Sequence, residues 1–253
     1  FTPDCRYDEC TGCGLCDFKT IKNRIGEGAI RRRPRPLLKP GQILAVRRIR
    51  LTYSKMGDAR FLGHLELSSV FARAVRRAGI PVRYSAGFHP APKITFSPPI
   101  SLGMESLEEF ADIEIEGYMA SGEAKDRLNL QLPEGIRIER AIDVPISFPA
   151  VTSAVLKADY EIQWSGVGGQ GSAISKEFME KEMFLFKKVR TGREYDIRPL
   201  IERLDSVDNK ILMTIKSGTE GSIKPGELMH ALFGLGDEET RLLRIVKTRT
   251  YLS

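Results

Sequence analysis

The chain has 253 residues, enough for one large domain or two smaller ones, and its composition is that of an ordinary globular protein. No apolar run reaches the roughly 18 residues that a membrane helix needs, so we expect no membrane span. The net charge of +6 is unevenly placed: residues 1–100 hold 19 Lys and Arg against 7 Asp and Glu, and the remainder holds 20 against 26. This asymmetry favours a polyanion or an acidic protein as partner of the N-terminal half, although a scatter of solvated charge would give the same counts.

All four cysteines lie close together at the start of the chain, with the spacing C-x4-C-x2-C-x2-C. Disulfides there would leave the large cysteine-free remainder unconnected, and nothing indicates an oxidising compartment, so we expect a metal site in a cytoplasmic protein. Thiols at every third residue are typical of a [4Fe–4S] cluster; because the fourth thiol lies upstream, unlike in bacterial ferredoxins, zinc stays open as the alternative. The predicted metal ligands are Cys5, Cys10, Cys13 and Cys16.

The segment 19–42 is predicted to be a linker, since it lacks periodicity and contains three prolines. Its basic run, Arg31 to Arg35 around Pro34, is suited to lie along phosphates, or it serves only as a solubilising spacer. The chain begins with Phe1 rather than Met, so we expect it to be a piece of a longer protein.

Regular patterns begin at residue 46 and predict the order β-α-β-β-α-β. The stretch 46–56 alternates and places Ile49, Leu51 and Tyr53 on one face of a strand. Residues 64–78 carry an apolar stripe at helical spacing, which leaves three arginines for solvent. The other elements expected in this half are strands at 93–100, 108–118 and 136–142 and a polar helix at 121–132.

The C-terminal part repeats this order loosely, without a residue-level repeat. It is expected to contain strands at 155–164, 210–216 and 242–252, helices at 173–181 and 225–234, and a hairpin at 184–197 that turns at Thr191-Gly192. The predicted fold class is therefore α+β, with two ferredoxin-like antiparallel-sheet units in tandem. The predicted domains are a Cys-rich metal-binding segment 1–18, the linker 19–42, and the two units at 43–150 and 151–253.

A glycine-rich stretch, "GVGGQG" at 166–171, matches the dinucleotide-binding pattern G-x-G-x-x-G. The strand before it alternates, whereas the first strand of a Rossmann fold is a continuous apolar run. We therefore expect a flexible turn here and no cofactor.

The stretch 83–103, "RYSAGFHPAPKITFSPPISLG", joins a predicted helix to a strand and mixes cations with aromatic side chains. Cations beside aromatic rings on a proline-stiffened loop suit stacking on unpaired bases and contacts to phosphate. The alternative is a loop that covers the sheet edge, with Phe88 in the core.

Two stretches resemble known bacterial proteins. "TPDCRYDECTGCGLCDF" is similar to the C-terminal end of B12-binding-type radical SAM proteins, and the region from Ile43 to Tyr251, most specifically "YSAGFHPAPKI", resembles the radical SAM-linked domain of unknown function. The resemblance implies an appendage of a radical enzyme, in cis or in trans, and supplies no catalytic residues. The C-x3-C-x2-C spacing of a radical SAM centre is absent, so we expect no such centre in this chain.

These observations lead to one preferred hypothesis: a substrate-handling module that binds tRNA or rRNA for a radical SAM modification enzyme. The predicted phosphate contacts are Arg48, Arg50, Arg73, Arg77, Arg83 and Lys93, and the predicted nucleotide contacts are Tyr84, Phe88 and His89. One alternative is a metal-independent RNA-processing enzyme with His89 as general base, Tyr84 as its partner and Lys93 stabilising a phosphorane. The other is a protein-docking scaffold for the radical SAM domain.

Overall fold

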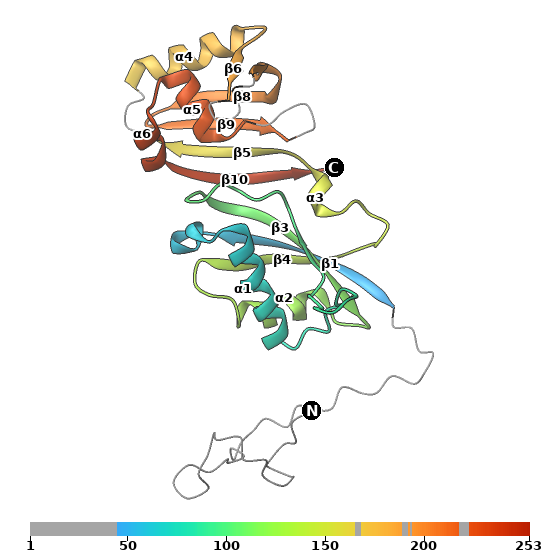
Figure 1. Cartoon of the computed structure of the whole chain (residues 1–253). Coiled ribbons are helices and arrows are strands. Elements are labelled where there is room, and N and C mark those ends of the chain that lie inside the picture. The colour runs from blue at the N-terminus through green and yellow to red at the C-terminus, as the bar shows by residue number, and fades with distance from the viewer. Residues whose placement is uncertain (1–44, 165–167, 189–191, 193, 218–222) are drawn as a thin grey trace, which may run out of the picture. The chain divides into compact units, whose positions relative to one another are not determined.

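The computed structural model describes residues 45–164, 168–188, 192, 194–217 and 223–253. These residues form a mixed α+β fold built on a mostly antiparallel sheet (Figure 1). The predicted Cys-rich segment 1–18 and linker 19–42 lie outside the described residues, as do the four cysteines. Within the described part, no helix combines the length and the hydropathy of a membrane span.

The first strand and the first helix form where the sequence pattern predicts them. Strand β1 runs from Val46 to Lys55, and its residues Ile49, Leu51 and Tyr53 are almost completely buried. Helix α1 spans His64–Arg77 and buries Leu67, Phe71, Ala74 and Val75, while Arg73, Arg76 and Arg77 stay exposed. An apolar stripe at helical spacing thus packs on an alternating strand.

The rest of the first half also follows the predicted order, with shifted bounds. The prediction for the strand at 93–100 was too long, because consecutive prolines at 98 and 99 follow Phe96 and supply no backbone N–H for a ladder. The observed elements are β2 (Ile94–Phe96), β3 (Glu105–Glu116), α2 (Ser121–Asn129) and β4 (Ile136–Val144).

The second half contains elements that the sequence patterns did not reveal. Strand β8 (Ile201–Val207) and the short helices α3 (Val151–Ala154) and α6 (Asp237–Leu242) were not predicted. The predicted hairpin is present as β6 (Leu185–Lys187) and β7 (Glu194–Asp196), but it forms its own two-stranded sheet. The remaining elements are β5 (Val155–Gln163), α4 (Gly168–Glu180), β9 (Lys210–Lys216), α5 (Pro225–Phe233) and β10 (Arg244–Leu252).

One eight-stranded sheet runs through both halves in the order β4-β1-β3-β10-β5-β9-β8, with β2 also paired to β3. Strands β3 and β10 are the two that pair in parallel, and their register joins Val246 to Glu105 and Lys247 to Ser106. The other described pairings of this sheet are antiparallel. Figure 1 shows α1 and α2 at one end of the sheet and α4, α5 and α6 at the other.

Side chains reinforce the short parallel contact between β3 and β10, which we call the seam. Arg244 Nε lies 2.9 Å from Glu105 Oε2, and Lys247 forms an ion pair with Glu109. The backbone N–H and hydroxyl of Thr250 donate to Glu108, each at 2.8 Å. The seam is thus an acidic stretch of β3 (Glu105, Glu108, Glu109) bound by polar residues of β10 (Arg244, Lys247, Thr250).

The buried apolar residues divide into two clusters, one for each half of the sheet. The first joins α1 and α2 to β1, β3 and β4 through residues such as Phe71, Leu128 and Ile113. The second joins α4 and α5 to β5, β8, β9 and β10 through residues such as Phe178 and Ile211. Each half therefore has its own core, and the seam lies between them.

Candidate nucleic-acid interface

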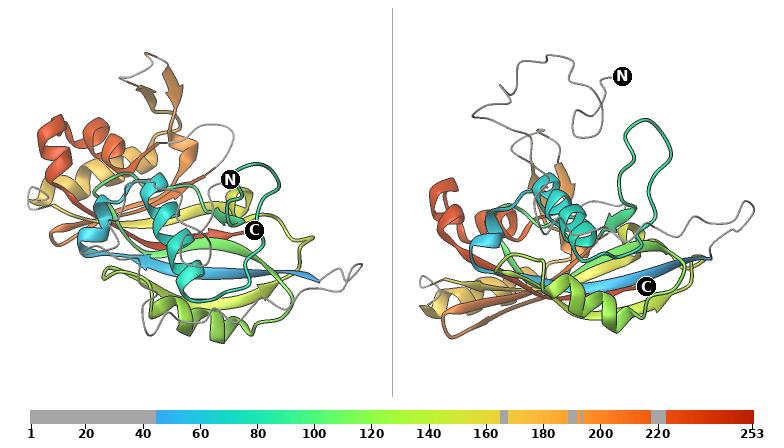
Figure 2. Two further views of the ribbon diagram at one scale, coloured as in Figure 1. Left: turned by 60° about the horizontal axis from the view of Figure 1, so that its bottom comes forward. Right: turned by 90° about the horizontal axis from the view of Figure 1, so that it is seen from below.

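The loop between α1 and β2 forms a narrow hairpin that protrudes from the sheet (Figure 2). Ser85 N donates to Ala91 O at 2.8 Å, Lys93 N donates to Arg83 O at 2.7 Å, and Tyr84 bridges Pro92. At its base, Arg83 N donates to the carbonyl oxygen of Glu114 on β3 at 2.7 Å. We call residues 83–93 the hairpin loop; its two arms hold each other, and β3 anchors them.

The tip of the hairpin loop exposes its aromatic residues. Phe88 is 101% exposed, His89 beside it is also exposed, and Tyr84 is 36% exposed. Gly87 has φ +126°, a backbone conformation that favours glycine and that turns the chain at the tip. The alternative that placed Phe88 in the core is therefore wrong, because the backbone pairing of the two arms carries the tip away from the sheet.

The cations at the base of the hairpin loop share one carboxylate. Arg83 Nη1 lies 3.2 Å and Lys93 Nζ lies 3.7 Å from Glu114 Oε2. Both cations are about two-fifths exposed, so solvent screens these contacts. Two positive charges beside one negative charge leave a net positive base below the aromatic tip.

The predicted phosphate contact of Arg50 is contradicted by its burial. Arg50 is 7% exposed and donates two hydrogen bonds to the Asp112 carboxylate on β3, from Nε at 2.7 Å and from Nη2 at 2.9 Å. Nη2 also donates to the Pro149 carbonyl, so the guanidinium is already occupied. Alternation on β1 predicted a solvent face here, but the segment that leads into α3 covers that face as well: Val151 N donates to the same Asp112 carboxylate at 3.2 Å.

The other predicted phosphate contacts stay at the surface. Arg48 is half-buried and donates to the Phe148 carbonyl at 2.9 Å. Arg73 and Arg77 are exposed on α1 and reach only backbone carbonyls, those of Ser69 and Gln131. Within the part of the chain that the structure describes, neither of these two arginines has a carboxylate partner.

The alternative catalytic set is not assembled by direct contacts. Lys93 forms an ion pair with Glu114. Among the described residues, no hydrogen bond links Tyr84, His89 and Lys93. The predicted turn at the glycine-rich stretch is partly wrong, because α4 begins at Gly168. Strand β5 before it pairs antiparallel on both sides, unlike the parallel strand of a dinucleotide-binding unit.

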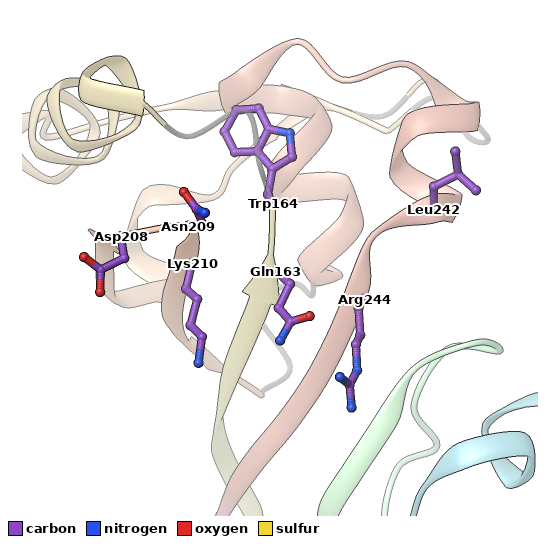
Figure 3. A pocket seen from close by; sticks show the side chains of 7 residues that line it. All are labelled: Gln163, Trp164, Asp208, Asn209, Lys210, Leu242 and Arg244. Carbon is purple, nitrogen blue, oxygen red and sulfur yellow. The ribbon is translucent and has the colours of Figure 1, made fainter.

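A hollow of about 500 Å³ lies at the end of β5, beside the turn between β8 and β9. In Figure 3 the side chains of Trp164 and Asp208 point in different directions, and Lys210 and Arg244 extend downward without meeting, so the four do not converge on one centre. Arg244 is already paired with Glu105. This hollow therefore lacks the convergent polar groups of a ligand site.

The structure also reveals a buried polar cluster that the sequence analysis missed. Lys247 and Glu109 are 4% and 3% exposed, and Ser97 Oγ donates to Glu109 Oε2 at 3.1 Å. Lys55, 3% exposed, donates to the carbonyls of Leu62 at 2.8 Å and of Arg60 at 3.3 Å. Two buried ammonium groups thus accompany one buried carboxylate.

Burial changes the acidity of the groups around this cluster. Desolvation lowers the pKa of Lys55, against the opposing effect of Glu109 and Glu66. Desolvation raises the pKa of Tyr53 and of Tyr160, and the charge of Glu109 adds to both effects. Perturbed groups of this kind gather at functional sites as well as in structural ion pairs.

A sequence signal for this cluster did exist. Lys55 continues the inward-facing period of Leu51 and Tyr53, and Lys247 stands two residues after the buried Ile245. In the same way, Glu109 precedes the inward-facing Ala111 by two residues. On each of the three strands, this period marks one charged residue as inward-facing, but it does not show that the three meet.

Residues 48–225 match the family described as "Uncharacterized protein conserved in bacteria (DUF2344)". The chain belongs to this family. The match begins inside β1 and covers the rest of the first half of the sheet, the hairpin loop and the second half as far as the start of α5. A search of curated proteins found no match to the chain.

Proposed function

We propose that the chain is an RNA-binding, substrate-handling module in which the hairpin loop contacts an unpaired nucleotide. The observation that carries this proposal is the fully exposed Phe88 beside His89 at the tip of a hairpin anchored to the sheet. An aromatic ring held away from the core is available to stack on a base, and each such stack contributes about 1–3 kcal/mol.

Phosphate contacts would come from the surface cations near the hairpin loop. Arg73 and Arg77 lie on α1, whose C-terminal end leads into the hairpin loop through residues 78–82, and neither has a carboxylate to compete with a phosphate among the described residues. Arg83 and Lys93 contribute less, because they share Glu114. This distribution favours modest, salt-dependent binding, with specificity from the tip.

The strand orders of the two halves support the same proposal. The halves have the strand orders β4-β1-β3-β2 and β10-β5-β9-β8, and each carries two main helices in the order β-α-β-β-α-β when the separate hairpin β6/β7 is left aside. We interpret both as ferredoxin-like units joined through the seam. Sheets of this kind recur among proteins that bind RNA, which is an argument by analogy only.

The resemblance to radical SAM-linked proteins supports a role beside a radical SAM modification enzyme, as a part of it or as a partner. In this proposal Cys5, Cys10, Cys13 and Cys16 hold an auxiliary [4Fe–4S] cluster, with zinc as the alternative metal. These cysteines lie outside the described residues, so the proposal rests on their spacing.

The RNA proposal is tested by titrating the full chain with tRNA and rRNA fragments at several salt concentrations. We expect an affinity that falls steeply with salt, and Phe88→Ala should weaken it by about 5- to 150-fold. The matched control is Phe148→Ala, because Phe148 is 55% exposed and lies outside the hairpin loop. Absence of binding at low salt, or equal losses in the two variants, would refute the proposal. RNA cleaved by the native chain but not by His89→Ala would favour the enzymatic alternative.

The metal proposal has a separate test. Anaerobically purified full chain should be brown, with a broad absorption band near about 400 nm, and should contain iron. Replacing Cys10 and Cys13 by serine should remove both the colour and the iron. A colourless protein that contains zinc would select the alternative metal, and a metal-free protein would rule out the site.

A further inference from the structure

A cleft of about 330 Å³ lies against the seam, between the segment 98–104 and the strands β5 and β9. Three lysines line it: Lys216 at the end of β9, Lys224 just before α5, and the buried Lys247 of β10. Tyr160, Ser101 and Ser217 also line it. We call this the lysine cleft; its described lining contains no carboxylate.

Among the described residues, the lysines that line the cleft outnumber the carboxylates that pair with them. Glu109, which does not line the cleft, pairs with Lys247, and its charge also acts on the buried Lys55. Lys216 and Lys224 are exposed and have no carboxylate partner among the described residues. A concave wall of one sign concentrates the electric field and attracts ions of the opposite sign.

The remaining wall of the lysine cleft is apolar. Pro99 and Ile100 lie on one side and Val155, Ala158 and Ile215 on the other. The volume is near the lower end of the range for small-molecule sites, which combine apolar walls with a few polar groups. An inorganic ion alone would leave these apolar walls unused.

We propose that the lysine cleft binds a small organic phosphate, with Lys216 and Lys224 contacting the phosphate and the proline-containing wall covering its organic part. Hydrogen bonds from ammonium groups to phosphate oxygens are charge-assisted and strong, and the lysines donate them in their ordinary protonated form. This binding is independent of the hairpin loop, so it stands or falls separately from the proposed RNA function.

The test is calorimetric titration of the full chain with phenyl phosphate, AMP and inorganic phosphate, with phenol and adenosine as uncharged controls. We expect both organic phosphates to bind more tightly than inorganic phosphate, and the uncharged controls not to bind. The double variant Lys216→Gln/Lys224→Gln should weaken phenyl phosphate by at least about tenfold. Both lysines are exposed, so the variant is expected to fold normally.

Two control variants separate this site from other surfaces. Lys210→Gln changes a lysine at the opposite end of β9 and should leave the affinity unchanged. Phe88→Ala should also leave it unchanged, because the hairpin loop takes no part. Failure of all three phosphates to bind, full affinity in the Lys216→Gln/Lys224→Gln variant, or inorganic phosphate binding as tightly as phenyl phosphate would overturn the proposal.

Discussion

Lys247 of β10 and Glu109 of β3 form an ion pair in which both side chains are almost completely buried. The two residues are far apart in the sequence, and their strands meet in a parallel contact whose register covers only two residue pairs. A buried charge is costly unless it is paired, so a register that separated Lys247 from Glu109 would leave both charges buried without a partner. The seam is consequently the place where substitutions should act on both halves together.

Lys247→Met should destabilise the protein by about 3–5 kcal/mol, because it removes the ion-pair partner of the buried Glu109 carboxylate. Urea unfolding followed by circular dichroism measures this loss. The double variant Lys247→Met/Glu109→Gln should recover most of it, since the amide can still accept from Ser97. Lys210→Met is the matched control: Lys210 pairs with Glu161 on the surface and should lose less than about 1 kcal/mol. Equal losses for Lys247 and Lys210 would contradict this account.

The seam should also make stability depend on acid pH through Glu105. Burial alone would raise the pKa of this carboxyl, but the hydrogen bonds from Arg244 and from the Gly57 N–H outweigh it and lower the pKa below the ordinary 4.5. A lowered pKa in the folded state means that the stabilisation is complete above the unfolded-state value and is lost as the pH falls through the folded-state value. The native chain should therefore be more stable than Glu105→Gln near neutral pH. The difference between their unfolding free energies should become smaller below about pH 4.5.

The measurement for Glu105 is a series of urea unfolding curves across the acid range for both proteins. Glu177→Gln is a suitable control, because Glu177 is exposed on α4 and pairs, among the described residues, only with Lys181 one turn away. Its difference from the native chain should be small at every pH. A Glu105→Gln difference that does not vary with pH would show that the carboxylate is not the stabilising form.

The parts of the fold that the sequence predicted are those set by local apolar periods. The stripe on α1 and the alternation on β1 each identify a buried face from a few neighbouring residues. Strand β8 was missed because its buried residues Ile201 and Leu204 are three apart, which does not resemble alternation. The bulge that shifts the register between Ile201 and Arg203 explains this spacing.

The seam and the buried cluster could not be placed from local pattern alone. Arg244 and Glu105 are 139 positions apart, and their contact depends on a parallel pairing between the two halves. The hairpin loop was found by its composition, but composition left two readings of Phe88 open. The backbone hydrogen bonds between its arms decide which residues reach solvent.

Arg50 and Asp112 form a second buried ion pair. The sequence predicted that Arg50 contacts RNA, whereas the structure predicts that its replacement lowers stability. Arg50→Met removes the guanidinium that holds Asp112 and the Pro149 carbonyl, and should cost about 3–5 kcal/mol in unfolding free energy. Arg203→Met is its control, because the Arg203–Asp205 pair is about half exposed. In RNA titrations, folded Arg50→Met should bind with native affinity. If the affinity of this variant depended less on salt than that of the native chain, Arg50 would contact a phosphate after all.

Gly122 in α2 and Gly135 just before β4 provide a test of how closely the connection between these elements packs. A Cβ added to Gly135 would lie 2.4 Å from the Met56 carbonyl oxygen and 2.9 Å from Ala59 Cβ, and Gly135 has φ +83°. Since Met56 N donates to the Gly135 carbonyl at 2.7 Å, the two backbones cannot separate without breaking that bond. Gly135→Ala should therefore destabilise the protein by about 2 kcal/mol or more.

Gly122 is the matched position, because it lies in the first turn of α2 with no atom within 4 Å of an added Cβ. Alanine restricts the unfolded chain and favours the helix, so Gly122→Ala should be neutral or stabilising by up to about 1 kcal/mol. Thermal and urea unfolding should give changes in stability of opposite sign for the two variants, because only Gly135 approaches its neighbours, Met56 and Ala59, this closely. A neutral Gly135→Ala variant would mean that this turn relaxes, and the connection from α2 to β4 would then be looser than its hydrogen bond to Met56 implies.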